Sequence, residues 1–369
     1  MKKMLLGTLR PTPGLVVVAL AISAPLFARD HSYTFVEFDT PGFQNTFPQD
    51  INPRGIIVGF ARTATNTGPA FVRGPNGDIT TFEPPGGSPR AVAFSINPAG
   101  AITGAYRDAN DNVHGLLRAP SGAITTFDAP GAGTDPDAGT APRNINAAGT
   151  IAGVVLDNNL VVHGFVRARD GTIATFDGPG AGTGPFQGTW TVIGDGINEA
   201  GATTGWIQDA NEVAHGFVRA PDGSITTFDA PGAGTDVFQG TTTGGINAAG
   251  AVDGSYVDAS YVFHGFVRAP DGNIKTFDIP GAGTGFFQGT IPANINNHGA
   301  IDGYYVDASD VAHGFVRAPD GSITTFDAPD AGTSAFQGTF PTGINEAGAI
   351  TGSYVDSNDI IHGFLRTRL

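Results

Sequence analysis

The stretch HGFVRAPDGSITTFDAPGAGT, residues 215–235, decides the fold because the chain repeats it. Close copies begin at His114, His163, His264 and His313. Each copy holds two runs rich in β-branched and aromatic residues, and a short turn, Pro-Asp-Gly in this copy, separates them. Glycine at the end of such a turn favours the three-residue loop of a β-hairpin. A sequence motif repeated in this way indicates a repeat architecture built from strands.

A second marker, Ile-Asn followed by a glycine, gives the number of repeats. Its asparagines are Asn52, Asn97, Asn146, Asn198, Asn247, Asn296 and Asn345. Successive asparagines are 45, 49, 52, 49, 49 and 49 residues apart, which is about the length that four short strands and their turns need. In the sixth unit the expected strands fall within residues 289–296, 300–307, 311–318 and 322–328. The chain therefore contains seven similar four-stranded units.

The two ends of the chain predict how the units are arranged. The last unit stops at HGFLRTRL, before its fourth strand, whereas YTFVEFDTPG near the start has the Phe-Asp and Pro-Gly of that missing strand. Pairing the first strand into the last unit would seal a ring and remove two exposed sheet edges, which a linear array would not gain. We predict an all-β fold: a single seven-bladed β-propeller of residues 29–369, with four antiparallel strands per blade, closed by the N-terminal strand.

Residues 1–28 have the features of a secretory signal peptide. A basic start (Lys2, Lys3 and Arg10) precedes a short apolar run and small residues before a plausible cut after Ala28. We therefore expect a secreted protein, extracellular or periplasmic, with no membrane span. The chain has no cysteine, so an exported domain of this composition would depend on core packing alone.

Charge limits the possible partners. The formal charge is −15, and removal of the three basic residues of the leader makes it −18. This balance argues against nucleic acid and anionic membrane surfaces as partners. A polysaccharide or an extracellular protein is compatible with it. We expect a monomer, no cofactor and no dedicated metal site, while the sequence leaves open whether calcium occupies the central channel.

A fourteen-residue spacing between the repeated histidine and a repeated aspartate predicts a pair across neighbouring strands. The pairs are His114 with Asp128, His163 with Asp177, His215 with Asp229, His264 with Asp278, His313 with Asp327 and, through the exchanged strand, His362 with Asp39. We interpret them as buried polar contacts that fix register, because six copies around a ring cannot converge on one substrate. A weak metal site is the alternative, although two ligands per unit are few.

An arginine recurs two residues after the repeated Phe. The set is Arg73, Arg118, Arg167, Arg219, Arg268, Arg317 and Arg366. Seven equally spaced arginines could form a basic ring. Because the chain is strongly acidic and every unit has an acidic residue, we favour pairing of these arginines with acids within or between units.

The unit resembles the repeat of the secreted bacterial HAF-repeat family. The resemblance is carried by Ile-Asn-x-x-Gly-x-Ile-x-Gly, then His-Gly-Phe, then Asp-Gly-x-Ile-x-x-Phe, and it covers essentially the whole chain after the leader. This chain departs from the name-giving His-Ala-Phe by having His-Gly-Phe, with Leu116 in place of Phe in the second unit. The resemblance implies an extracellular bacterial protein with a propeller-like fold, and it implies no catalytic residues.

Departures from the repeat mark the candidate ligand site. The connection to the next unit carries Phe-Gln-Gly-Thr at Phe186, Phe238, Phe287 and Phe336, but not after the first two units. In a propeller these loops gather at one rim of the channel, so one sector should be irregular. Near it we expect a site for a sugar or another neutral polar ligand, made by Trp190, Trp206, Asp195, Gln208 and Asp209. The alternative is that both tryptophans fill gaps between blades.

Three functions are compatible with these observations. A non-catalytic module that binds a polysaccharide or a surface partner through the rim loops needs no catalytic set, and we favour it. A structural or adhesive repeat protein is the second. A propeller enzyme, such as a glycan lyase, hydrolase or lactonase, would have to use unrepeated residues near the axis, because fold alone does not identify an activity. Those residues are Arg90, Arg143, Asp135, Asp137, Asp195 and His298.

Overall fold

The computed structural model describes residues 33–86 and 90–369, and it is all-β. The predicted signal peptide, residues 1–28, lies outside the described residues. Each unit begins with two antiparallel strands that pair with each other. The first strands are β2 (Asn45–Ile51), β6 (Val92–Ile96), β10 (Gly139–Ile145), β14 (Gly188–Thr191), β18 (Gly240–Ile246), β22 (Gly289–Ile295) and β26 (Gly338–Ile344). The second strands are β3 (Ile57–Arg62), β7 (Ile102–Arg107), β11 (Ile151–Leu156), β15 (Thr203–Gln208), β19 (Val252–Val257), β23 (Ile301–Val306) and β27 (Ile350–Val355).

In each unit the segment that carries the His-Gly-Phe motif forms the third strand. The segment that carries the Ile-x-x-Phe motif forms the fourth strand. The third strands are β4 (Ala70–Arg73), β8 (Val113–Arg118), β12 (Val162–Arg167), β16 (Ala214–Arg219), β20 (Phe263–Arg268), β24 (Ala312–Arg317) and β28 (Ile361–Arg368). The fourth strands are β5 (Ile79–Phe82), β9 (Ile124–Phe127), β13 (Ile173–Phe176), β17 (Ile225–Phe228), β21 (Ile274–Phe277) and β25 (Ile323–Phe326). β1 (Tyr33–Phe38) pairs antiparallel with β28, with Phe38 opposite Gly363, so the first strand completes the last unit.

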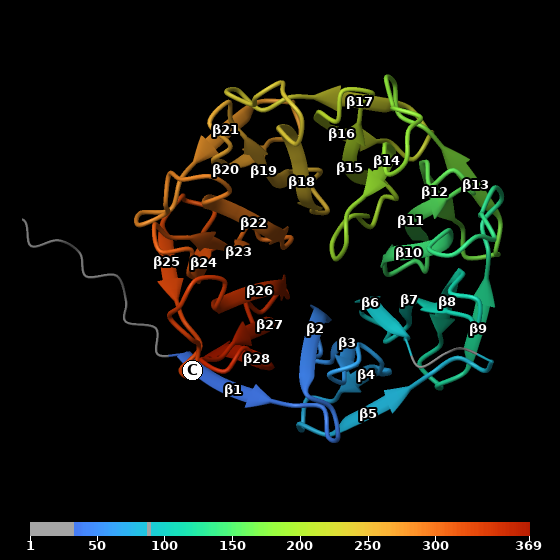
Figure 1. Cartoon of the computed structure of the whole chain (residues 1–369), viewed down its shortest axis with the longest axis horizontal. Coiled ribbons are helices and arrows are strands. Elements are labelled where there is room, and N and C mark those ends of the chain that lie inside the picture. Colours follow the sequence, from blue (N-terminus) through green and yellow to red (C-terminus); the bar gives the residue numbers. More distant parts are fainter. Residues whose placement is uncertain (1–32, 87–89) are drawn as a thin grey trace, which may run out of the picture. The chain divides into compact units, whose positions relative to one another are not determined.

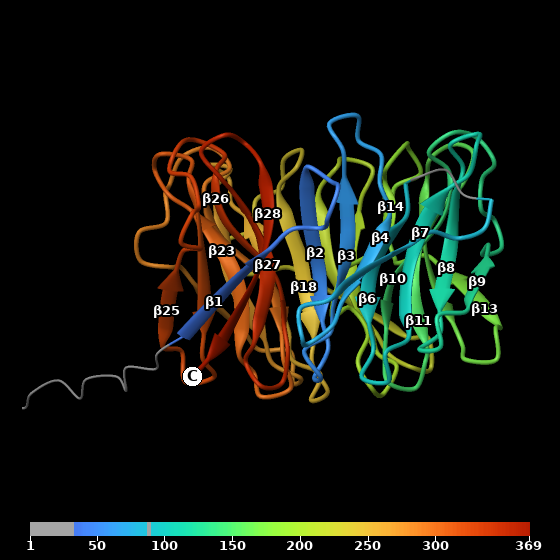
Figure 2. The same cartoon turned by 90° about the horizontal axis from the view of Figure 1, so that it is seen from below.

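Neighbouring units are linked by short bridges rather than by continuous ladders. Within a unit all pairings are antiparallel, whereas single parallel bridges such as Ala214 to Gly240 join one unit to the next. Figure 1 shows the units around a common centre, with strands such as β2, β18 and β22 nearest to it. Figure 2 shows their strands standing side by side, with the connecting loops at two opposite faces. The fold is therefore propeller-like. Among the described residues no helix is long and apolar enough to cross a membrane.

Seven asparagine side chains link the units in a cycle. Each asparagine of the Ile-Asn marker donates from Nδ2 to the backbone carbonyl of the corresponding asparagine in the next unit, and Asn345 donates to Asn52. In most units Oδ1 also accepts from the backbone N–H four residues later, as in Asn198 with Ala202. All seven side chains are buried, so each satisfies a turn and a neighbouring unit at once.

The apolar core lies between units and explains the repeated glycine and phenylalanine. Phe266 is fully buried with Ile246 and Val252 of its own unit, and Phe228 of the preceding unit packs edge-on against it at 5.9 Å between ring centroids. A side chain on Gly254 would collide with the Phe266 ring and with the carbonyl of the first strand. Glycine in the second strand thus leaves the space that the aromatic ring fills.

The recurring arginines stack on aromatic rings, so their predicted pairing with acids is wrong. Arg268 lies over the Phe228 ring of the preceding unit at 4.9 Å, and the equivalent arginines repeat the contact. No ion pair joins any of the seven to an acid among the described residues. The aromatic ring comes from a different unit, which spacing within one repeat does not reveal.

We expect Asn198→Ala to lower the free energy of unfolding by about 1–3 kcal/mol, because it leaves the half-buried Ala202 N–H without its acceptor and removes one of the two hydrogen bonds to the Asn247 carbonyl. Urea unfolding followed by circular dichroism measures the change. Asn358→Ala, in an exposed turn, is the matched control and should change the free energy of unfolding by less than about 0.5 kcal/mol. Equal losses in both variants would contradict the role of the asparagine cycle.

Candidate functional site

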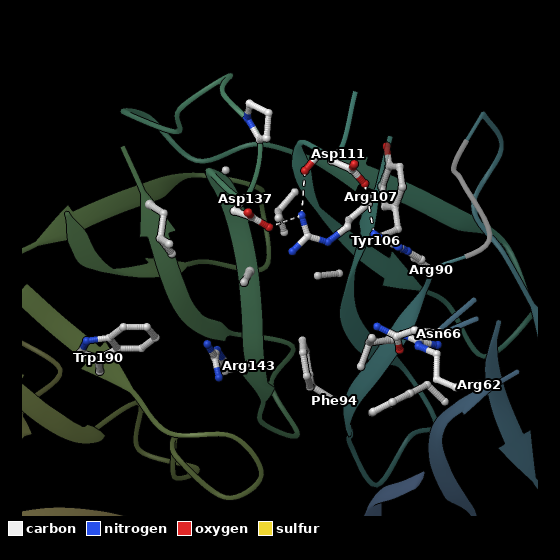
Figure 3. Close-up of a pocket in the computed structure, with 18 residues that line it drawn as sticks. Arg62, Asn66, Arg90, Phe94, Tyr106, Arg107, Asp111, Asp137, Arg143 and Trp190 are labelled. Carbon is white, nitrogen blue, oxygen red and sulfur yellow. Dashed lines mark hydrogen bonds and ion pairs between the residues drawn. The ribbon is translucent and has the colours of Figure 1, made fainter. Parts of the chain in front are cut away.

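A cavity of about 610 Å³ opens in the irregular sector, over the first strands of the second, third and fourth units. Figure 3 shows that its labelled side chains come from several units and that most of them are arginine or aromatic. The lining includes Arg62 of β3, Phe94 of β6, Arg107 of β7, Arg143 of β10 and Trp190 of β14. The first strands bring these residues together because they lie side by side around the centre, whereas in the sequence they are far apart.

The cavity reverses the charge balance of the chain. Four arginines and two aspartates line it, whereas the whole sequence has 19 basic and 34 acidic residues. Arg107 forms an ion pair with Asp137 at 2.7 Å and donates to the Asp111 carbonyl at 2.8 Å, and Arg90 lies 3.3 Å from the Asp111 carboxylate. Both carboxylates are therefore already paired, and the cavity has a net positive charge.

Arg143 is the charged lining residue without an ion pair or hydrogen bond among the described residues. In Figure 3 its guanidinium lies between Phe94 and Trp190, at 5.6 and 5.8 Å from the two ring centroids. It has no hydrogen bond or ion pair with any described residue. Burial lowers the pKa of Arg143 to about 10, so the side chain is still protonated at neutral pH. A half-buried cation with free donors and aromatic faces on both sides is suited to hold an anion.

Arg62 is buried on the first-unit side of the cavity but is satisfied within the protein. It donates from Nη1 to the carbonyls of Ala61, Gly68 and Ala91 and lies over the Phe60 ring at 4.4 Å. Burial, and secondarily the charge of Arg90, lowers the pKa of Arg62 to about 10. Arg62 thus contributes positive charge and a fixed wall, while Arg143 is the free donor.

The five predicted ligand residues do not form one site. Trp190 lines the cavity, and Trp206 lies behind it, opposite in the strand pairing and stacked at 5.9 Å between centroids. Trp206 is in the middle of β15. Gln208 ends β15, and Asp209 holds the turn that follows by accepting from the backbone N–H groups of residues 211 and 213. Gln208 and Asp209 were predicted to flank the tryptophans as ligands, but neither lines the cavity that Trp190 lines.

The unrepeated residues also separate. Arg90, Arg143 and Asp137 line the cavity, whereas Asp135 and His298 do not. Asp195 lies in a smaller central cavity of about 200 Å³. Sequence reasoning missed Arg62, Phe94 and Arg107. Their signal was departure from the repeat, since Arg107 stands where other units have Val257 or Val306.

The six histidines lie beside the predicted aspartates, with Nδ1 at 2.8–3.0 Å from a carboxylate oxygen. The pairs are not buried as expected, because each aspartate side chain is at least half exposed. In five units Nε2 also approaches an aspartate of the preceding turn at 3.5–3.9 Å, such as Asp307 near His313. Each of these histidines is held between two acids at the surface of its own unit.

Buried carboxylates lie in the central cavity and in the strands near it: Asp195 lines the cavity, whereas Asp253 and Asp302 belong to β19 and β23. Burial raises the pKa of Asp253 to about 7, although its Oδ1 accepts from the Gly245 N–H at 2.7 Å. Burial, together with the charges of the other carboxylates, raises the pKa of Asp195 and Asp302 well above the usual range. Among the described residues no three His, Asp or Glu side chains are arranged to hold a metal ion.

Comparison with known proteins identifies a fold and no family. No protein-family model and no curated protein matches the sequence. Among solved structures, the chain is similar to virginiamycin B lyase from Staphylococcus aureus, with a TM-score of 0.60 and 14% identity over 92% of this chain and 100% of that one. A streptogramin B lyase structure gives a TM-score of 0.58 and 15% identity over 90% and 97% of the two chains. At such low identity the shared property is the propeller-like fold alone.

We expect the protein to be more stable at pH 5 than at pH 8. The pKa of Asp253 is about 7 when folded and near 4 when unfolded, so the unfolded chain loses its proton first and stability falls as pH rises between these values. Asp253→Asn keeps the acceptor for Gly245 and removes the titration. It should raise the free energy of unfolding at pH 8 by more than about 1 kcal/mol. Urea unfolding across this pH range tests the expectation, and an unchanged slope in Asp253→Asn would contradict it.

Proposed function

We propose that the protein is an extracellular carbohydrate-binding propeller whose cavity takes a sugar that carries a carboxylate. The single observation that carries the proposal is Arg143, a protonated guanidinium between Phe94 and Trp190 with no protein partner. A carboxylate can accept two parallel hydrogen bonds from one guanidinium, which is the strongest neutral-pH contact such a side chain makes. The flanking rings can pack against the C–H face of a sugar.

The surroundings of Arg143 support an anionic ligand over a neutral one. Arg62, Arg90 and Arg107 add positive charge to the cavity, and Asp111 and Asp137 are already paired with arginines. Elsewhere the chain is acidic, so long-range repulsion opposes anions everywhere except at this sector. The cavity therefore combines local attraction with selectivity for an anion of small size.

Binding is favoured over catalysis by the chemistry of the lining. Among the lining residues that the structure describes, arginine and aromatic side chains dominate, and there is no serine, cysteine or histidine. Both carboxylates are neutralised by arginines, so neither is poised as a base. These features support a binding module rather than a glycan lyase, hydrolase or lactonase.

The proposal includes the finer architecture and the location. A seven-bladed ring closed by the N-terminal strand is supported by the seven-membered asparagine cycle and by the pairing of β1 with β28. Action outside the cytoplasm is supported by the leader-like residues 1–28. Both agree with a ligand of extracellular origin.

Arg143→Gln tests the ligand assignment. We expect it to weaken binding of trigalacturonate about ten- to a hundredfold, because one charge-assisted contact is lost. Trp190 and Trp206 are the two tryptophans of the chain, so intrinsic fluorescence reports the occupied cavity directly, and calorimetry gives the affinity. Higher salt should weaken the wild-type complex.

Arg54→Gln is the matched control, because Arg54 is an exposed arginine outside the cavity. It should leave the affinity for trigalacturonate unchanged. Thermal unfolding of Arg143→Gln should show a stability equal to or above that of the wild type, since a buried unpaired charge is removed. Equal affinity in the wild type and Arg143→Gln, or binding of neutral trigalactose as tight as that of trigalacturonate, would contradict the proposal.

A further inference from the structure

Four phenylalanines stand exposed at equivalent positions of consecutive units. They belong to the repeated Phe-Gln-Gly loops before the first strands β14, β18, β22 and β26, and we refer to them as the phenylalanine row. The exposed fractions are 52% for Phe186, 62% for Phe238, 39% for Phe287 and 82% for Phe336. Large apolar side chains exposed at one repeated position bury little surface on folding, so core packing does not account for them.

The backbone of the row is unfavourable for phenylalanine. All four residues have φ between 56° and 66°, the left-handed region that glycine or asparagine adopts more readily. A bulky residue there costs on the order of 1–3 kcal/mol. Neither burial nor backbone preference therefore explains these rings, which leaves contact with a ligand as the physical reason.

The loops hold each ring in a fixed position. The N–H of Phe336 donates to the Asp310 carbonyl at 2.7 Å, and the N–H of Phe238 donates to the Glu212 carbonyl at 3.0 Å. The glutamine after each phenylalanine accepts from the backbone of its own loop, as Gln337 does from Ser334 at 3.1 Å. A ring on such a braced loop is preorganised, so binding loses little conformational entropy.

The row begins next to the cavity, on the same side of the units. In the third unit Asp137 occupies the position of the phenylalanine, has the same left-handed backbone and lines the cavity. In the fourth unit the Phe186 carbonyl accepts from the Trp190 indole N–H at 3.2 Å. The phenylalanine row thus starts at the cavity and continues from unit to unit through the fourth to seventh units. These units do not contribute arginines to the cavity.

We propose that the phenylalanine row is a second binding surface, a series of stacking platforms for the sugar units of a neutral polysaccharide. One exposed ring at the same position of each unit suits a polymer that presents the same apolar sugar face repeatedly, and several weak contacts along one chain add through avidity. Acidic residues in or facing the same loops, namely Asp236, Asp310 and Asp359, disfavour anionic lipids and acidic polymers. The phenylalanine row is a surface separate from the cavity. This proposal does not depend on the function proposed for the cavity.

The sixth unit should be the strongest platform. Phe286 is 66% exposed and lies 4.3 Å from Phe287 between ring centroids, and Tyr261 lies 5.1 Å from Phe286. Phe263 lies 5.8 Å from Phe287 and supports it from below in the third strand. This cluster offers the largest aromatic area of the row.

The test compares three proteins on an immobilised panel of neutral glucans, mannans, xylans and galactans. They are the wild type, a variant with all four phenylalanines changed to glycine, and a variant with all four changed to tyrosine. We expect the wild type to retain at least one neutral polysaccharide and the glycine variant to bind it about a hundredfold more weakly. The tyrosine variant should retain binding, because the aromatic faces are kept.

The glycine variant also distinguishes binding from folding. Glycine relieves the left-handed backbone, so its melting temperature should equal or exceed that of the wild type while binding is lost. Arg143→Gln should bind the neutral polysaccharide normally, which separates this surface from the cavity. The proposal is overturned if the wild type retains no neutral polysaccharide, if the glycine variant binds equally well, or if only phosphatidylglycerol vesicles or a protein shows the dependence on phenylalanine.

Discussion

The structure depends on the buried asparagine at the end of each repeat marker. One side chain bonds two backbone groups: it accepts from an N–H of its own turn that has no other acceptor, and it adds a second hydrogen bond to a carbonyl of the next unit. Because every unit does the same, the turn conformation and the spacing between units are fixed by a single residue type. The asparagines follow the first strands, while the ligand-facing loops precede them. The spacing between units is thus determined by the asparagine turns after the first strands. The sequence of the loops before the first strands is free to vary.

That separation explains how near-identical units can carry different chemistry. The third strand keeps a buried Phe such as Phe217 or Phe315, and the second strand keeps the glycine that makes room for it. Changes at Arg107 and Arg143 alter the surface of the central strands without disturbing this core. The first four units thereby contribute to a cationic cavity, and the last four keep exposed aromatic loops. One scaffold presents two surfaces of opposite polarity.

Much of the architecture could be predicted because it follows from local spacing. The interval from His313 to Asp327 contains one hairpin, so its length determines which side chains meet across the strands. The pairing of β1 with β28 could be predicted because the first strand carries the motif that the last unit lacks. The cavity could not be predicted in the same way. Arg62, Phe94 and Arg143 belong to different units, and their approach depends on how those units are rotated around the centre. Asp195 was misplaced because the insertion that carries it turns into the central cavity rather than toward Trp190.

The pairing of β1 with β28 affects the order in which the strands can pair during folding. Tyr33 and Arg368 face each other across this seam, although the other strands of the fold lie between them in the sequence. β1 therefore has an unpaired edge until β28 has been made, and its pairing with β28 is the contact of greatest sequence separation in the fold. Every other unit can assemble from residues close in sequence. A chain interrupted before β28 would hold most of its units and yet be left with two open sheet edges, which would make it prone to aggregate.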